Sequence, residues 1–130
     1  MGVTRLIGLV VLITACKSAG TDPADDRLSG RYDWIRSSGG ITGRTLTPAS
    51  ENYTVRFQFG GNQVTVFRND SAKATSTFTV RGNEVTYQPA LSVLVFDQRI
   101  DTQTLRVIAA DTIALADPCC DRYDHHFVRR

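Results

Sequence analysis

The chain has 130 residues, which is enough for one domain with its own core and too few for two. Hydrophobic residues make up 42% of the sequence and charged residues 22%, as in an ordinary globular protein. The formal net charge is only +2, and the arginines are scattered singly along the chain. This pattern lacks the clustered basic face of nucleic-acid-binding proteins, so we expect no nucleic-acid partner.

The first 15 residues are typical of a secretion signal peptide. A lone positive charge at Arg5 precedes a short apolar run over residues 6–13. This run is well short of the about 20 apolar residues that a membrane-spanning helix needs. It is followed by Thr-Ala-Cys at 14–16, and the stretch resembles the bacterial lipobox. The resemblance implies that residues 1–15 form a signal helix that is cleaved, and that the thiol of Cys16 receives a diacylglycerol.

Residues 16–27 are expected to hold the lipid-bearing cysteine and a flexible tether. The stretch after Cys16 is polar, contains Gly and Pro, and has no apolar periodicity. A flexible segment of this length spans roughly 15–20 Å on average. Lys17 takes the place of the aspartate that favours the inner membrane in enteric bacteria. We therefore expect a membrane-anchored protein of the cell envelope, on the periplasmic or surface face of the outer membrane.

From residue 28 to residue 130 the hydrophobic pattern has a period of two, which is the period of β-strands. The clearest case is residues 53–59, where every second side chain is apolar and would share one buried face. The segments that we expect to form strands are 31–36, 53–59, 63–68, 75–80, 84–88, 91–96, 105–108, 112–115 and 124–129. Short strands joined by successive tight turns predict an all-β domain, an up-and-down antiparallel barrel of about eight strands.

The two ends of this domain resemble the small lipocalin-like lipoproteins that are common in Bacteroidetes-type bacteria. The stretches that carry the resemblance are LSGRYDW at 28–34, SSGGITG at 37–43, TP at 47–48, DTIAL at 111–115, DPCCD at 117–121 and HFVR at 126–129. The resemblance implies a calycin-type barrel with an interior site for a small apolar ligand. It also implies a barrel-closing pair of Trp34 and Arg129, although Gly30 and Trp34 are separated by three residues rather than by the family's one.

The size of the inward side chains determines whether the barrel has room for a ligand. An eight-stranded barrel is just wide enough to be filled by side chains or to hold one small ligand. The candidates for the interior or for a ligand site are Trp34, Tyr53, Phe57, Phe59, Phe78, Tyr87 and Phe127. A filled core and a ligand cavity both stay open, and the connection 37–50 is either a lid over one barrel end or a mobile loop.

Four potential metal ligands, Cys119, Cys120, His125 and His126, lie close together near the end of the sequence. Adjacent residues of a strand point to opposite faces, so the two histidines do not converge easily. Their spacing matches no common metal motif, and we expect no metal and no cofactor. A disulfide between Cys119 and Cys120 would be strained, because adjacent α-carbons lie about 3.8 Å apart. A reduced pair remains equally open.

We expect that the protein is not an enzyme, because the sequence has no nucleophile elbow, phosphate loop or dinucleotide fingerprint. The leading hypothesis is a membrane-anchored binding or accessory module for a small apolar ligand. The alternative is an assembly or inhibitor lipoprotein that binds a protein partner, with the Gly-rich segment 38–47 as a contact. A less favoured hypothesis is metal or redox handling through Cys119, Cys120 and the two histidines.

Overall fold

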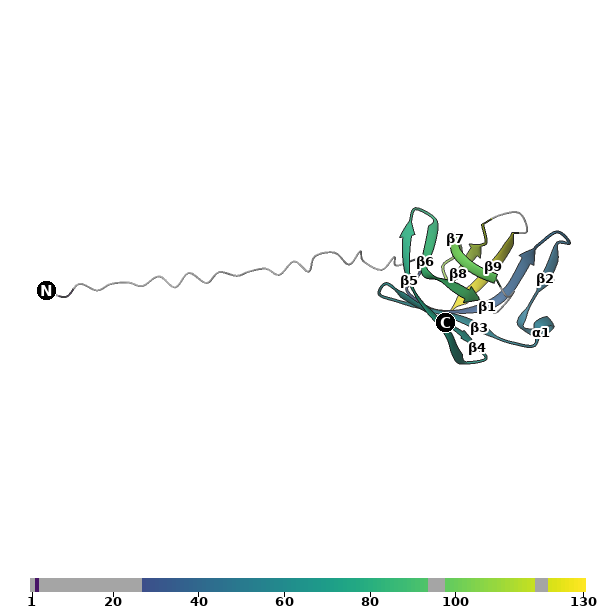
Figure 1. Ribbon diagram of the computed structural model, residues 1–130, viewed down its shortest axis with the longest axis horizontal. Helices are drawn as coiled ribbons and strands as arrows, with labels where there is room; N and C mark the ends of the chain where they lie inside the picture. The colour runs from purple at the N-terminus through teal and green to yellow at the C-terminus, as the bar shows by residue number, and fades with distance from the viewer. Residues whose placement is uncertain (1, 3–26, 94–97, 119–121) are drawn as a thin grey trace.

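The computed structural model describes residue 2 and residues 27–93, 98–118 and 122–130, and these form nine strands and one short helix (Figure 1). The strands are β1 (Gly30–Gly39), β2 (Arg44–Leu46), β3 (Val55–Gly60), β4 (Gln63–Arg68), β5 (Ser71–Arg81), β6 (Glu84–Val93), β7 (Gln98–Ala109), β8 (Thr112–Ala116) and β9 (Tyr123–Arg129). The helix α1 (Pro48–Glu51) is a single turn between β2 and β3. In the part of the chain that is described, no helix is long and apolar enough to span a membrane. The predicted signal helix, Cys16 and most of the tether lie outside the described residues.

The sheet closes on itself because β1 pairs with β3 on one side and with β9 on the other. From β3 to β9, each strand is antiparallel to the next strand in the chain. The predicted up-and-down barrel of eight antiparallel strands is therefore confirmed. The short strand β2 is an addition that pairs with the last three residues of β1.

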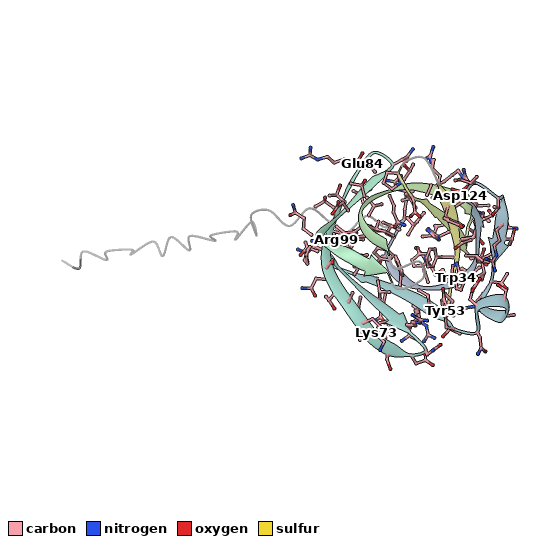
Figure 2. The ribbon with its side chains drawn as sticks, turned by 45° about the vertical axis from the view of Figure 1, so that its right-hand side comes forward. Trp34, Tyr53, Lys73, Glu84, Arg99 and Asp124 are labelled. Carbon is pink, nitrogen blue, oxygen red and sulfur yellow. The ribbon has the colours of Figure 1, made fainter. Side chains whose placement is uncertain are left out.

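Inside/outside alternation follows the predicted pattern most clearly in β3. Val55, Phe57 and Phe59 are buried, whereas Arg56 is half-buried and Gln58 is exposed. Each buried aromatic side chain contributes about 1.5–3 kcal/mol relative to exposure, and this gain sets the register of the strand. Figure 2 looks into the ring of strands, with Trp34 and Tyr53 beside each other and Lys73, Glu84 and Asp124 on its outside.

Several strands are longer than the hydrophobic pattern predicted. The strand β6 continues through Pro89, where the sequence predicted an end. Its pairing with β7 is interrupted between Thr86 and Leu91, so proline lies where the ladder is already irregular and its missing N–H costs no regular hydrogen bond. The strand β7 begins at Gln98, whereas the sequence predicted a strand only over residues 105–108. The first half was missed because polar and apolar residues alternate only weakly there.

The two ends of the barrel differ. The β3–β4, β5–β6 and β7–β8 turns lie at one end, which we call the sealed end, and the chain reaches the barrel there at Arg27. Leu28 is fully buried at this end, and the Tyr32 hydroxyl donates a hydrogen bond to the Arg27 carbonyl at 2.8 Å. The opposite end, which we call the loop end, carries the β1–β2 and β4–β5 turns.

The half of the interior nearer the sealed end is filled by aromatic rings. Phe57 packs against Phe127 with ring centroids 4.8 Å apart, and Phe59 packs edge-on against Phe78 at 5.1 Å. Tyr32 meets Phe59 at 5.9 Å. Aromatic pairs at these separations contribute about 0.5–1.5 kcal/mol beyond their area burial. This cluster makes the sealed half of the lumen a packed core.

Candidate functional site

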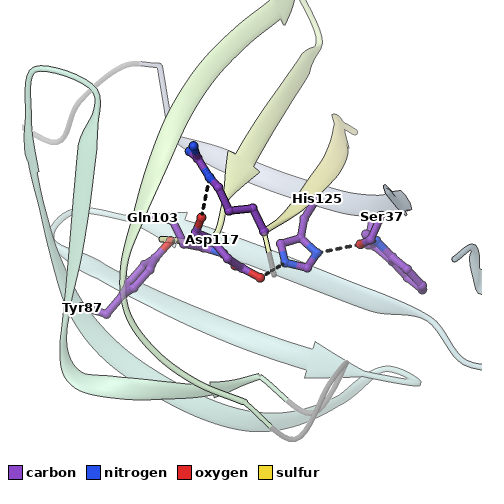
Figure 3. A network of polar contacts seen from close by, with 7 residues as sticks. Ser37, Tyr87, Gln103, Asp117 and His125 are labelled. Carbon is purple, nitrogen blue, oxygen red and sulfur yellow. Dashed lines mark hydrogen bonds and ion pairs between the residues drawn. The ribbon is translucent and has the colours of Figure 1, made fainter. Parts of the chain in front are cut away.

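A chain of buried polar side chains crosses the half of the lumen nearer the loop end (Figure 3). Ser37 comes from β1, Tyr87 from β6, Gln103 from β7 and His125 from β9, while Asp117 directly follows β8. All five side chains are almost completely buried. Burying polar groups costs free energy unless they are paired. This polar chain is therefore the part of the interior that we consider as a functional site.

A β-bulge in β1 places Ser37 in the interior. Along β9, Trp34 pairs with Phe127 and Arg36 pairs with His126, so Ile35 is an extra residue. Without this bulge, strict alternation after Trp34 would turn Arg36 inward and Ser37 outward. The bulge lies where β1 changes its partner from β3 to β2. It therefore delivers a serine to the lumen and leaves the arginine on the outside.

One side of the polar chain begins at Tyr87. Burial raises the pKa of the Tyr87 hydroxyl far above its ordinary value of 10.0, and the negative charge of Asp117 raises it further. The hydroxyl therefore stays protonated and donates to Oε1 of Gln103 at 2.8 Å. This bond fixes the orientation of the amide, whose Nε2 donates to Oδ1 of Asp117 at 3.0 Å.

The other side of the polar chain begins at Trp34. Its indole Nε1–H donates to Oγ of Ser37 at 2.8 Å, and the same Oγ lies 2.6 Å from Nδ1 of His125. Nε2 of His125 lies 2.9 Å from Oδ2 of Asp117. Because a carboxylate only accepts, Nε2 carries a proton, and Nδ1 of the neutral imidazole then accepts a hydrogen bond from the Ser37 hydroxyl. Donors thus run from both sides towards Asp117.

The backbone of Asp117 is held in place by two hydrogen bonds. Its N–H donates to the Tyr123 carbonyl at 3.0 Å, and its carbonyl accepts a hydrogen bond from Nε of Arg122 at 3.2 Å. Within the described residues, Nε of Arg56 is the buried side-chain nitrogen that has no hydrogen-bond partner, and Arg56 is not part of the polar chain. The polar chain is therefore satisfied throughout, and each hydrogen bond contributes about 0.5–1.5 kcal/mol net.

The order Ser37–His125–Asp117 has the connectivity of a nucleophilic triad, with the two ring nitrogens exchanged. A nucleophile must reach its substrate, but Ser37 has 0% of its surface exposed. Its Oγ is also occupied by the Trp34 indole. In this conformation the arrangement orients a serine and an imidazole inside the lumen without presenting the hydroxyl to an electrophile.

The residues predicted for the interior are placed around this network and the aromatic cluster. Those that are at least 95% buried are Trp34, Phe57, Phe59, Phe78, Tyr87 and Phe127. Tyr53 is partly exposed and stacks on Trp34, with ring centroids 5.8 Å apart and an interplanar angle of 18°. Trp34 contacts the polar chain through its indole N–H, and Tyr87 is a member of the polar chain.

The predicted pair of Trp34 and Arg129 is wrong in its aromatic partner. The guanidinium of Arg129 lies over the ring of Tyr32, 5.2 Å from its centroid, and its Nη2 donates to the Tyr32 hydroxyl at 2.6 Å. Across the β1–β9 ladder, Arg129 is opposite Tyr32, whereas Trp34 is opposite Phe127. Trp34 thus lies one level closer to the loop end, beyond the reach of this contact.

The four potential metal ligands are not all described. Cys119 and Cys120 lie outside the described residues, while His125 faces the lumen and its neighbour His126 faces the outside of β9. Burial and the nearby Arg36 lower the pKa of His126 below 6.5. In the described parts of the chain, no group of three or more His, Cys, Asp or Glu side chains could hold a metal ion.

Sequence reasoning missed Ser37, Gln103 and Asp117. Gln103 shares the inward face of β7 with Leu105, so an alternation that extended two residues further would have found it. Ser37 could not be found, because the bulge at Ile35 breaks the alternation. Comparisons with family models, curated proteins and solved structures found no match to this sequence.

Proposed function

We propose that this chain is a lipid-anchored, non-enzymatic binding module whose barrel holds one small ligand with an apolar body and a polar group. The observation that carries the proposal is the uneven distribution of aromatic and polar side chains in the lumen. Aromatic rings occupy the sealed half, whereas the polar chain crosses the loop-end half. Small-molecule sites are mostly apolar and contain a few fixed polar groups, and the mouth of a barrel is a usual place for them.

The contacts at the sealed end support a lipocalin-like relationship. In lipocalins, a glycine and a tryptophan separated by one residue on the first strand meet an arginine of the last strand. Here Gly30 and Tyr32 are separated by one residue, and Arg129 lies over Tyr32. Gly30 has φ +122°, and a Cβ there would lie 3.7 Å from Nε of Arg129. Tyrosine would thus take the place of the family's tryptophan.

The lipid anchor is part of the same proposal. It rests on the lipobox-like residues 13–16 behind an apolar run and a positive charge. Two or three acyl chains on Cys16 would make attachment effectively permanent, since each buried methylene contributes about 0.8 kcal/mol. The absence of an aspartate at position 17 favours the outer membrane.

Binding to the membrane-anchored protein can be tested by titrating the full chain in detergent with the fluorescent fatty acid cis-parinaric acid. Its carboxylate supplies a polar group and its acyl chain an apolar body. We expect His125→Phe to weaken binding at least about tenfold, which corresponds to about 1.4 kcal/mol. Tyr87→Phe removes only the hydroxyl that starts the polar chain and should weaken binding less.

The matched control is His126→Phe, because this side chain is also buried but faces the outside of β9. Its affinity should stay within about twofold of the parent. Native mass spectrometry of the protein purified from bacterial membranes supplies a second readout, a retained small molecule. A parent protein that neither retains a molecule nor binds the fatty acid would contradict the proposal, as would equal losses in both histidine variants.

A protein partner is the second candidate function, and one observation favours it. Ile41, at the tip of the β1–β2 hairpin, is 89% exposed at the loop end. The segment around it, Gly39–Gly43, is rich in glycine and projects beyond the barrel. A photo-crosslinker in place of Ile41 would trap a partner in intact cells, whereas the same group at the exposed Lys73 of β5 would not.

A further inference from the structure

An apolar hairpin tip is exposed at the sealed end of the barrel. Val107 is 53% exposed and Ile108 is 47% exposed at the end of β7, and Ala109 and Ala110 follow them, also exposed. The pairing of β7 with β8 shifts between Val107 and Ala109, so the tip is irregular and extends beyond Ile113, the inward residue of β8 nearest this end. Four consecutive exposed apolar residues are unusual on a surface that faces only water.

Arginines surround this tip. Arg27 donates to the Gly82 carbonyl at 2.7 Å, which places it between the tip and the β5–β6 turn. Arg27 and Arg129 line, together with Val107 and Ile113, a recess of about 260 Å³ at this end. Arg81 and Arg130 are exposed nearby. Among the described residues at this end, the acidic side chains are Glu84, Asp111 and Asp33, and the carboxylate of Asp33 lies 3.5 Å from Nε of Arg130.

The position of Arg27 fixes which end of the barrel would lie closest to a membrane. Ten residues lie between Cys16 and Arg27, so the two α-carbons are at most about 40 Å apart when the segment is fully extended and roughly 15–20 Å apart on average. The loop end lies farther away by the length of the strands, and the ten residues of β1 alone rise about 30 Å. A lipid on Cys16 would therefore bring the apolar tip and its arginines to the bilayer.

We infer that the sealed end docks on the bilayer that carries the anchor, with Ile108 and Val107 inserted at the boundary between the lipid headgroups and the acyl chains. The inference rests on the proposed lipidation of Cys16. Apolar side chains at the headgroup boundary gain by leaving water, and arginines there face anionic phosphates. The loop end, with the polar chain and Ile41, then points away from the membrane towards water.

The test uses the full acylated chain in vesicles of phosphatidylcholine and phosphatidylglycerol whose acyl chains are brominated. Bromine quenches tryptophan at contact, and the sequence has a single tryptophan, Trp34, as a constant background. We expect Ile108→Trp to be quenched at least about twofold relative to unbrominated vesicles. Ala110→Trp is a second probe of the same tip. Ile41→Trp, exposed at the opposite end, should be quenched no more than the parent.

Mass spectrometry of the same vesicles separates the two levels of the proposal. If the diacylglyceryl mass on Cys16 is missing and the protein does not float with the vesicles, the anchor fails and docking fails with it. If the acylated protein floats but both tip probes are unquenched, docking alone is overturned, as it would be if a second copy of the chain covered the tip. Equal quenching at Ile108→Trp and Ile41→Trp would also overturn it.

Discussion

Asp117 receives hydrogen bonds from both sides of the lumen, so two neighbouring side chains rely on its carboxylate as their acceptor. Gln103 and His125 each direct a proton at one of its two oxygens. A buried donor that loses its acceptor cannot turn to water, and the loss costs about 1–3 kcal/mol per group. The site therefore contributes to stability as well as to the proposed binding.

Replacing Asp117 by leucine should lower the free energy of unfolding by about 1–3 kcal/mol for each of the two donors left without an acceptor. Urea unfolding followed by the fluorescence of Trp34 measures this directly. Asp124→Asn is the matched control, because its carboxylate pairs with exposed Arg106 and should change stability by about 0–1 kcal/mol. An Asp117→Leu protein as stable as the parent would contradict the account of the network.

His126 should make the fold sensitive to mild acid. Its pKa in the folded protein lies below the unfolded value of 6.5, because burial disfavours the imidazolium and Arg36 and Arg106 repel it, with Asp124 opposing them. As the pH falls below about 6.5, the unfolded chain takes up this proton before the folded chain does. Stability is therefore full above this pH and decreases in the window down to the folded pKa.

We expect His126→Gln to flatten the decrease in the free energy of unfolding between about pH 7 and about pH 5. Urea midpoints at several pH values give the comparison, and the curves of parent and variant should run parallel near pH 8. Identical slopes through the acid range would show that His126 does not contribute.

At the scale of elements, the bulge in β1 decides which side chains reach the lumen. Deleting Ile35 would remove the extra residue and leave Trp34 and Ser37 inward, so most stability should remain. Deleting Asp33, in the regular part of the strand, would force Tyr32 or Trp34 out of the interior and cost about 3–5 kcal/mol, as does loss of a buried aromatic side chain. Urea unfolding ranks the two deletions, and the reverse order would contradict this interpretation of the bulge.

The elements that the sequence predicted well are those whose apolar residues alternate strongly. The residues 55–59 of β3 and the turn after them illustrate this, since both follow from local side chains and glycine. The first half of β7 and the path of β6 through Pro89 were missed because neighbouring strands stabilise them. The site was less predictable still, because Ser37 and His125 are separated by 88 positions and meet only through the barrel register.

At the scale of the whole molecule, closure gives the barrel two unlike ends. The sealed end combines the Tyr32–Arg129 contact with the exposed tip at Val107 and Ile108. The loop end is nearer the polar chain and carries the hairpin with Ile41. Anchoring one end and binding at the other would hold the ligand-binding mouth at a fixed side of the membrane surface.

A nitrogen-15 spectrum of the histidine side chains shows whether the polar chain forms the ligand site. The sequence has two histidines, so two rings are observed. Without ligand, His125 should be the Nε2–H tautomer with Nδ1 accepting from Ser37. On addition of cis-parinaric acid, the ring nitrogens of His125 should shift while those of His126 stay constant. Unchanged His125 resonances at saturating fatty acid would contradict the account.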